Sequence, residues 1–141
     1  MPCETTVQVT WGDTDAGGLI YFPRFFHFVV VGLNDYFRPA DDHLMETLRR
    51  DGHTLPAVDA TATFERPLRA GGTARVETTV TAGETSLTVE FTVRDEDGQR
   101  AASGEVRFVL VDGQFEPTPL PDRVRECVRE RGDGTTAGAD G

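Results

Sequence analysis

The segment after Pro23 constrains the fold most, because it is apolar on nearly every side. Few polar positions interrupt the run of large apolar residues there, which comprises Phe25, Phe26, Phe28, Val29, Val30, Val31, Leu33, Tyr36 and Phe37. Pro23 suits the first turn of a helix, and a helix that is apolar nearly all round must be buried on most of its faces. We therefore predict a long buried helix over 23–37, together with a structure large enough to cover it.

The rest of the chain supplies that cover, because its apolar residues recur with a period of two. This alternation predicts strands over 5–11, 55–65, 73–81, 86–94 and 101–111. In the first strand Val7, Val9 and Trp11 share one face. The apolar sets of the last two strands are Leu87, Val89, Phe91 and Val93, and then Val106, Phe108 and Leu110.

Turn sequences at 81–84 and 95–98 predict hairpins between the later strands. The pattern as a whole predicts an α+β fold, in which an antiparallel sheet of about five strands wraps around one long central helix. A short second helix is expected over 40–50, and another over 122–131. The 141 residues suit one domain. Residues 131–141 contain no large apolar side chain, so we expect a domain over 1–130 and a disordered tail after it.

Charge and composition exclude several classes of function. All 14 basic residues are arginine, against 24 acidic ones, and the net charge of −10 argues against binding to nucleic acid or to an anionic membrane. The longest apolar stretch, 19–33, is too short and too interrupted to span a bilayer. No signal peptide is evident, so a cytoplasmic protein is expected. Cys3 and Cys127 suit free thiols, and no histidine has metal-ligand spacing with a carboxylate.

The most informative motif is residues 11–23, Trp-Gly-Asp-Thr-Asp-Ala-Gly-Gly-Leu-Ile-Tyr-Phe-Pro, which joins the first strand to the long helix. It places Asp15 close to a helix N-terminus, where unpaired backbone N–H groups and the positive end of the helix dipole lie. A carboxylate that faces such an oxyanion site suits acyl transfer. The simpler alternative is that Asp15 only caps the helix or holds the turn. Asp13 is expected to bind backbone amides across the turn.

This motif and the order of the elements resemble the hotdog-fold acyl-CoA thioesterases of the 4-hydroxybenzoyl-CoA thioesterase family over residues 5–112. The shared pattern is aromatic-x-Asp-x-Asp-x-x-Gly, then two hydrophobic residues, two aromatic residues and proline. The resemblance implies that Asp15 is the catalytic carboxylate and that the backbone N–H of Phe22 is the oxyanion donor. It also implies hydrolysis of an acyl thioester to free acid and thiol, without a cofactor. The family forms homodimers or homotetramers with each site at the dimer interface.

Further substrate contacts follow from the resemblance, namely Gly17, Gly18, Tyr21, Phe25, Phe26 and Ser86. The phenylalanines suggest a greasy or aromatic acyl pocket, and Gly17 and Gly18 also permit unusual backbone conformations. The chain departs from the family at Glu84, where relatives carry basic residues for the CoA phosphates. The thioester carrier is therefore either an acyl carrier protein or a CoA held by other arginines. The candidates are Arg66, Arg69, Arg94 and Arg100.

Several alternatives stay open at this point. Asp15 could attack the thioester itself or activate a water molecule, and both roles require an ionised carboxylate. A hotdog dehydratase or hydratase would need a histidine in the loop before the helix, and none lies between Gly12 and Phe26. A non-catalytic acyl-thioester-binding protein is the third possibility. His27, within the apolar helix, is expected to be a core or subunit-interface histidine.

Overall fold

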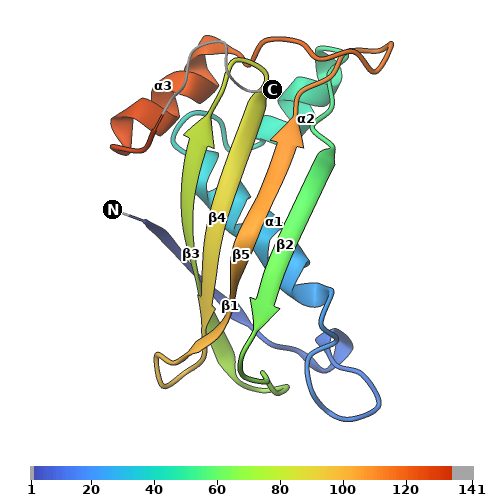
Figure 1. Cartoon of the computed structure of the whole chain (residues 1–141), viewed down its shortest axis with the longest axis vertical. Coiled ribbons are helices and arrows are strands. Elements are labelled where there is room, and N and C mark those ends of the chain that lie inside the picture. The colour runs from blue at the N-terminus through green and yellow to red at the C-terminus, as the bar shows by residue number, and fades with distance from the viewer. Residues whose placement is uncertain (1, 135–141) are drawn as a thin grey trace.

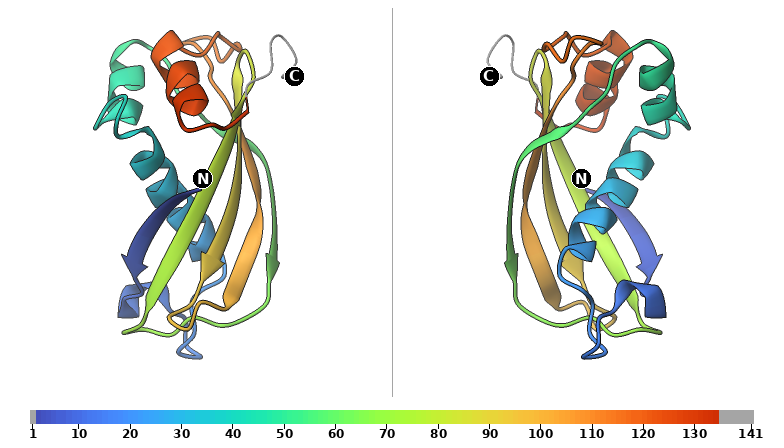
Figure 2. Two further views of the ribbon diagram at one scale, coloured as in Figure 1. Left: turned by 90° about the vertical axis from the view of Figure 1, so that its left-hand side faces the viewer. Right: turned by 90° about the vertical axis from the view of Figure 1, so that its right-hand side faces the viewer.

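The structure, a computed structural model, describes residues 2–134 and arranges them as a curved sheet with helices against one face (Figures 1 and 2). In chain order the elements are β1 (Cys3–Gln8), η1 (Trp11–Asp13), α1 (Arg24–Phe37), α2 (Leu44–Arg50), β2 (Ala57–Phe64), β3 (Thr73–Ala82), β4 (Ser86–Arg94), β5 (Arg100–Val109) and α3 (Asp122–Glu130). The five strands form one antiparallel sheet in the order β1-β3-β4-β5-β2. The predicted α+β class and the five-stranded antiparallel sheet are confirmed.

The hairpins β3–β4 and β4–β5 form the centre of the sheet, as the turn sequences predicted. Alternate residues of these strands face the helices and are buried, and they include both apolar sets read from the sequence. Because the hairpin turns and the alternation agree on one register, the sequence specifies this part of the sheet well. The strand pair β1–β3 closes one edge, and β2, which pairs only with β5, forms the other.

Helix α1 lies along the face of the sheet and packs against β1, β3 and β4. Its buried side consists of Phe25, Phe28, Val29, Gly32, Leu33, Tyr36 and Phe37. The opposite side is open, because one sheet covers only one face of a helix: His27 is exposed there, and Val30 is 41% exposed. The expected burial on most faces is therefore wrong for the single chain, and His27 is not a core residue. A role for His27 at a subunit interface stays a prediction.

Two boundaries differ most from the sequence prediction. Strand β1 ends at Gln8, and Trp11 begins the 3-10 turn η1 instead of facing the core from a strand. The chain turns there because the carbonyl of Thr10 accepts a hydrogen bond from the backbone N–H of Asp13 (2.9 Å). Helix α2 begins at Leu44 and not at residue 40. Arg38 keeps a helical backbone conformation, but Pro39 has no N–H with which to continue the helical hydrogen bonds, so α1 ends at Phe37 and turns intervene.

The first residues of the expected tail are in contact with α1. Two N–H groups of the Arg131 guanidinium donate hydrogen bonds to the carbonyl oxygen of Tyr36, at 3.0 and 2.7 Å. The Tyr36 hydroxyl donates to Asp133 at 2.6 Å. Contacts with the sheet reach Gly134, whose carbonyl accepts the Ala82 N–H at 3.0 Å, and the rest of the expected tail, 135–141, lies outside the described residues. Within residues 2–134, no helix has the length and apolar character needed to cross a bilayer.

Candidate active site

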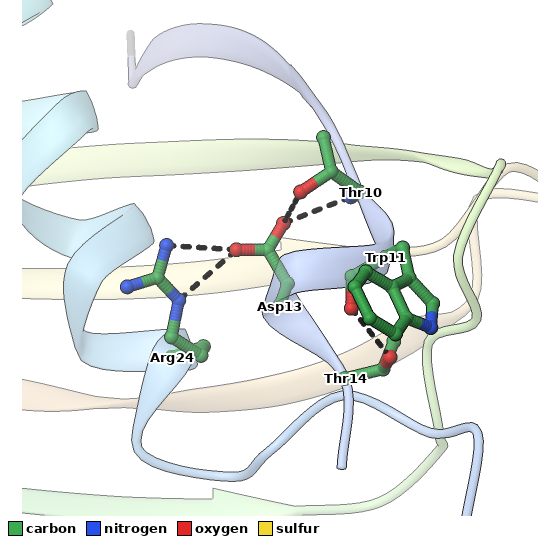
Figure 3. A network of polar contacts seen from close by, with 5 residues as sticks. All are labelled: Thr10, Trp11, Asp13, Thr14 and Arg24. Atoms are coloured by element: carbon green, nitrogen blue, oxygen red, sulfur yellow. Dashed lines mark hydrogen bonds and ion pairs between the residues drawn. The ribbon is translucent and has the colours of Figure 1, made fainter.

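A buried carboxylate holds the loop before α1 in place (Figure 3). Asp13 Oδ2 accepts hydrogen bonds from the backbone N–H of Thr10 at 2.9 Å and from its hydroxyl at 3.1 Å. Asp13 Oδ1 accepts two more from Arg24, the first residue of α1. Burial by itself would raise the pKa of Asp13, but the hydrogen bonds from Thr10 and Arg24 outweigh it and leave the pKa below its ordinary value. The predicted backbone contact is present, whereas the ion pair with Arg24 was not predicted.

Between this anchor and α1 the chain forms a small hairpin. Thr14 and Ile20 form an isolated antiparallel bridge, and the backbone N–H of Asp15 donates to the carbonyl of Leu19 at 3.0 Å. Gly18 adopts a φ of +78°, which favours glycine at the tip. The returning segment also pairs with the loop after β2, because the Ile20 N–H donates to the Leu68 carbonyl at 2.8 Å. The hairpin is thus held from two sides.

Asp15 lies at the exposed end of this hairpin. Its Oδ1 accepts the backbone N–H of Gly17 at 2.9 Å, so the side chain does hold the turn, as the simpler interpretation expected. Its Oδ2 has no hydrogen-bond partner within residues 2–134. The carboxylate lines a hollow of about 600 Å³ together with Trp11, Gly12, Thr14, Ala16, Gly18 and Ala70. One oxygen is therefore occupied and the other is without a partner, in a residue that lines this hollow.

The backbone N–H of Phe22 is an unpaired donor at the start of α1. The neighbouring N–H groups are occupied, since those of Tyr21 and Arg24 donate to the carbonyls of Asp13 and Tyr21 at 2.8 Å each. Pro23 has no N–H. Within the described part of the chain the Phe22 N–H has no backbone acceptor, and its residue is 58% exposed. A free donor at the positive end of a 14-residue helix is suited to stabilise negative charge on a ligand oxygen.

A cluster of aromatic rings lies beside this donor. The ring centroid of Phe64, the last residue of β2, is 5.7 Å from that of Phe22 and 5.3 Å from that of Phe25. These rings line an apolar hollow of about 450 Å³ with Leu19, Ile20, Glu65, Arg66 and Pro67. Phe64 was not among the site residues predicted from the sequence. The available signal was a large apolar residue at the end of a strand whose other residues are small or polar.

The remaining predicted contacts are divided. The ring of Tyr21, which is half exposed, lies 5.8 Å from that of Phe22, whereas Phe26 packs against Phe91 of the sheet at 6.2 Å and does not line the hollow. Ser86 begins β4 at the opposite end of the sheet from the 14–22 loop and is only 3% exposed. A single chain therefore does not bring Ser86 or its neighbour Glu84 to Asp15.

Two of the candidate phosphate-binding arginines lie nearer, since Arg69 forms an isolated β-bridge with Leu19 and Arg66 lies beside the aromatic rings. Arg66 lines the aromatic hollow and also a second hollow of about 300 Å³, which it shares with Arg94 and Arg100. Arg100 is paired with Glu65 at 2.6 Å and Arg94 with Glu77 at 3.2 Å. Arg66 has no ion pair within residues 2–134. The same residues contain no cluster of histidine, cysteine and carboxylate side chains that could hold a metal ion.

Together, the sheet, the long helix on its face and the carboxylate-bearing hairpin before that helix define a protein of the hotdog class. Comparison with known families agrees. The chain belongs to the thioesterase-like superfamily, whose family model matches residues 9–128.

The individual relatives share a low sequence identity with this chain. The 1,4-dihydroxy-2-naphthoyl-CoA hydrolase of Thermosynechococcus vestitus is 25% identical over 131 residues, which cover 89% of this chain and 90% of the relative. A solved 1,4-dihydroxy-2-naphthoyl-CoA thioesterase from Synechocystis superimposes with a TM-score of 0.84 at 21% identity, covering 92% of this chain and 97% of the other. A gentisyl-coenzyme A thioesterase gives a TM-score of 0.78 at 23% identity, covering 89% and 98%.

Proposed function

We propose that this protein is a thioesterase that hydrolyses an acyl thioester to a free acid and a thiol, with Asp15 as its catalytic carboxylate. Membership of the thioesterase-like superfamily is the observation that carries the proposal. The open Oδ2 of Asp15 and the unpaired N–H of Phe22 support it, because both groups belong to one short, anchored segment. No histidine lies between Gly12 and Phe26 to serve the proton transfers of a dehydratase.

The chemistry requires two contributions from this segment. The Phe22 N–H and the N-terminus of α1 stabilise the negative charge that develops on the thioester oxygen, an effect of about 3 kcal/mol for one well-placed donor. Asp15 supplies the second contribution in one of two ways. It takes a proton from water, which then adds to the carbonyl carbon, or it adds itself to give a mixed anhydride that water cleaves. In both cases the carbon–sulfur bond breaks and the thiolate is protonated.

We further propose that the acyl group is aromatic and that its carrier is coenzyme A. The rings of Phe22, Phe25 and Phe64 offer flat apolar surfaces beside the Phe22 donor. The relatives whose names include naphthoyl-CoA and gentisyl-coenzyme A make this substrate class the first to test.

A homodimer is part of the proposal. Strand β2 is an edge strand that pairs only with β5, and seven of its eight residues are exposed, including Val58 and Phe64. Natural proteins rarely leave a long exposed edge unpaired. Antiparallel pairing of two β2 edges would continue the sheet from one subunit into the other. It would also bring the end of the partner's sheet at which β4 begins closer to this site. Sedimentation equilibrium would show a dimer, and a monomer at all concentrations would contradict this part.

The decisive experiment is thiol release from 1,4-dihydroxy-2-naphthoyl-CoA and benzoyl-CoA, followed with a thiol-reactive dye, for the wild type and Asp15→Asn. The asparagine carbonyl can still accept the Gly17 N–H, so the turn should persist while turnover falls by at least about a thousandfold. Asp112→Asn is the matched control. Asp112 also accepts the N–H of the residue two positions on (2.8 Å), in the turn between β5 and α3 at the other end of the molecule.

The outcomes separate the competing functions. Wild-type rates in Asp15→Asn would remove Asp15 from the mechanism. Tight binding of a non-hydrolysable acyl-CoA thioether without turnover by the wild type would favour the non-catalytic alternative. Turnover of a benzoyl carrier protein but not of the CoA ester would correct the carrier.

A further inference from the structure

Trp11 is exposed to an extent that folding does not explain. Its surface is 87% exposed, although burying a tryptophan side chain would contribute more than burying almost any other residue. It is also the only tryptophan of the chain. Scattered exposed leucines or valines are ordinary, but a large aromatic ring that stands free of its own domain usually meets something else.

The backbone that presents this ring is rigidly held. Trp11 begins η1, whose N–H and carbonyl groups are fixed by Thr10 and Asp13, and the Thr14 hydroxyl donates to the Trp11 carbonyl at 2.7 Å. The Asp13–Arg24 pair ties the same turn to α1, and Figure 3 shows the Trp11 side chain on the other side of the turn from Arg24. The backbone at Trp11 is therefore fixed, and the residue does not belong to a flexible loop.

The ring borders the hollow that contains Asp15. Apart from Asp15, the other lining residues are glycine, alanine and threonine, so Trp11 supplies the only aromatic surface of this hollow, which we call the Trp11 slot. Asp15 is the only charged residue among them, and no cation lines the slot. Phosphate groups therefore do not suit it, whereas an extended, uncharged chain does.

The aromatic hollow suits the acyl group of a thioester, the part on the other side of the carbonyl from the sulfur. Gly18 lines the Trp11 slot, and the next residue, Leu19, lines the hollow of Phe22, Phe25 and Phe64, so the two hollows flank one short stretch of backbone. A carbonyl placed between Asp15 and the Phe22 N–H would direct its two substituents to opposite sides of that stretch. If the acyl group occupies the apolar side, the sulfur and the chain attached to it extend toward Trp11.

We infer that Trp11 is a substrate-binding residue, whose indole face packs against the uncharged pantetheine arm next to the sulfur of the thioester. The inference rests on the proposed function, since it needs a thioester at Asp15. It adds a ligand contact to those of the Asp15 carboxylate and the Phe22 N–H. Coenzyme A and acyl carrier proteins present the same arm, so the contact should not depend on the carrier.

Because Trp11 is the only tryptophan, its fluorescence reports this contact directly. Titration of the full chain with pantetheine, which has no phosphate on its arm and no acyl group, should change the emission in a saturable way. Coenzyme A should do the same, whereas benzoate, which represents the acyl product, should not. No response at pantetheine concentrations that inhibit hydrolysis would overturn the inference. A response to benzoate alone would overturn it as well. An emission already typical of a buried tryptophan, which changes only with protein concentration, would place Trp11 in a subunit contact and would also overturn the inference.

Kinetics provide the second test. Trp11→Ala should lower kcat/KM on the order of tenfold, mainly through KM, for benzoyl-CoA and for the benzoyl thioester of N-acetylcysteamine, which keeps only the part of the arm next to the sulfur. Trp11→Phe should retain most of the activity. Phe115→Ala is the matched control, because Phe115 is 70% exposed and belongs to the segment between β5 and α3, which lies at the opposite end of the molecule.

The two proposals fail in different ways. Unchanged kcat/KM in Trp11→Ala, with normal hydrolysis by the wild type, would overturn the role of Trp11 alone. A saturable response to pantetheine in a protein that hydrolyses no thioester would overturn the proposed hydrolysis alone. A melting curve of Trp11→Ala that matches the wild type would show that folding is intact, as expected for so exposed a side chain.

Discussion

The guanidinium of Arg24 donates two hydrogen bonds to one oxygen of Asp13, from Nε at 3.0 Å and from Nη2 at 2.7 Å. This pair joins η1 to the first residue of α1. The two candidate catalytic groups, the Asp15 carboxylate and the Phe22 N–H, belong to the segment between its ends. Their separation therefore depends on a pair that lies outside the reacting groups.

Removal of the Arg24 guanidinium should affect both stability and activity. Arg24→Met would leave the Asp13 carboxylate, which is only 6% exposed, without its counter-ion while keeping much of the apolar stem. We expect a loss of about 1–3 kcal/mol in the free energy of unfolding, measured with urea, because Arg24 itself is partly exposed. The exposed helical pair Arg38–Asp35 supplies a control, since Arg38→Met should cost less than about 0.5 kcal/mol. Equal costs for the two variants would contradict the anchoring role.

The same carboxylate predicts a dependence of stability on acid. The pKa of Asp13 is lowered in the folded protein, so the unfolded chain binds a proton at a higher pH than the folded one. The stabilisation is therefore complete above the ordinary aspartate pKa of about 4 and is lost as the pH falls toward the folded value. Urea unfolding from pH 6 down to pH 3 should show a shallower decline for Asp13→Asn than for the wild type. If the free energy of unfolding declined equally in both proteins, other carboxylates would dominate its dependence on acid.

The sequence predicted the parts of the molecule in which several local signals agree. Strand β4 was predicted with its exact ends, because alternation and two turn sequences fix it together. Trp11 was misplaced because alternation continues past Gln8 in the sequence, whereas the backbone of Thr10 begins a turn. Phe64 and Arg24 were missed for a different reason. Their roles arise from contacts with residues far along the chain, which no local pattern encodes.

Within the candidate site the same distinction holds. The motif placed Asp15 and Phe22 on one loop before a helix, and that placement depends only on neighbouring residues. Ser86 was expected beside them, but it begins β4 at the far end of the sheet from that loop, and four further elements separate the two along the chain. Whether a second chain supplies it depends on how two copies pack, which the periodicity of one chain does not determine.

Buried Thr78 offers a stabilising substitution. Its Oγ1 is buried on β3 without a hydrogen-bond partner in residues 2–134, and it lies where α1 approaches the strand at Gly32. Thr78→Val keeps the shape and removes the unsatisfied hydroxyl, so we expect a gain of about 1 kcal/mol in thermal or urea unfolding. A destabilised variant would indicate that a water molecule satisfies this hydroxyl.

The close approach at Gly32 predicts the opposite sign for a neighbouring change. A Cβ at this position would lie 2.6 Å from Thr78 Oγ1 and 3.1 Å from Val76 Cγ1, both in the buried layer between α1 and β3. Gly32→Ala should therefore destabilise the protein by about 1–3 kcal/mol, although alanine favours a helix. Unfolding of Gly32→Ala in a Thr78→Ala background supplies the control, because the smaller side chain should recover part of the loss.

The C-terminal contacts with α1 predict where the chain can be shortened. Truncation after Glu130 removes the two hydrogen bonds from Arg131 to Tyr36, the guanidinium 4.5 Å above the Tyr36 ring, and the Asp133 carboxylate. We expect a loss of about 2–4 kcal/mol in the free energy of unfolding. Truncation after Gly134 keeps every one of these contacts and should leave stability unchanged. If both truncations melt like the full chain, the domain ends at residue 130.

Tyr36 should also make the protein sensitive to alkali. Burial, and then the hydrogen bond to Asp133, raise the pKa of Tyr36 above its usual value in the folded protein. The unfolded chain therefore loses this proton first, and stability declines as the pH rises above the ordinary tyrosine pKa of about 10.

The chain contains no lysine, so few other groups titrate in this range. The thiols Cys3 and Cys127, whose pKa values burial also raises, contribute in the same direction. Urea unfolding between pH 8 and pH 11 should decline less steeply for Tyr36→Phe than for the wild type, while Tyr21→Phe, a change at an exposed ring, should follow the wild type.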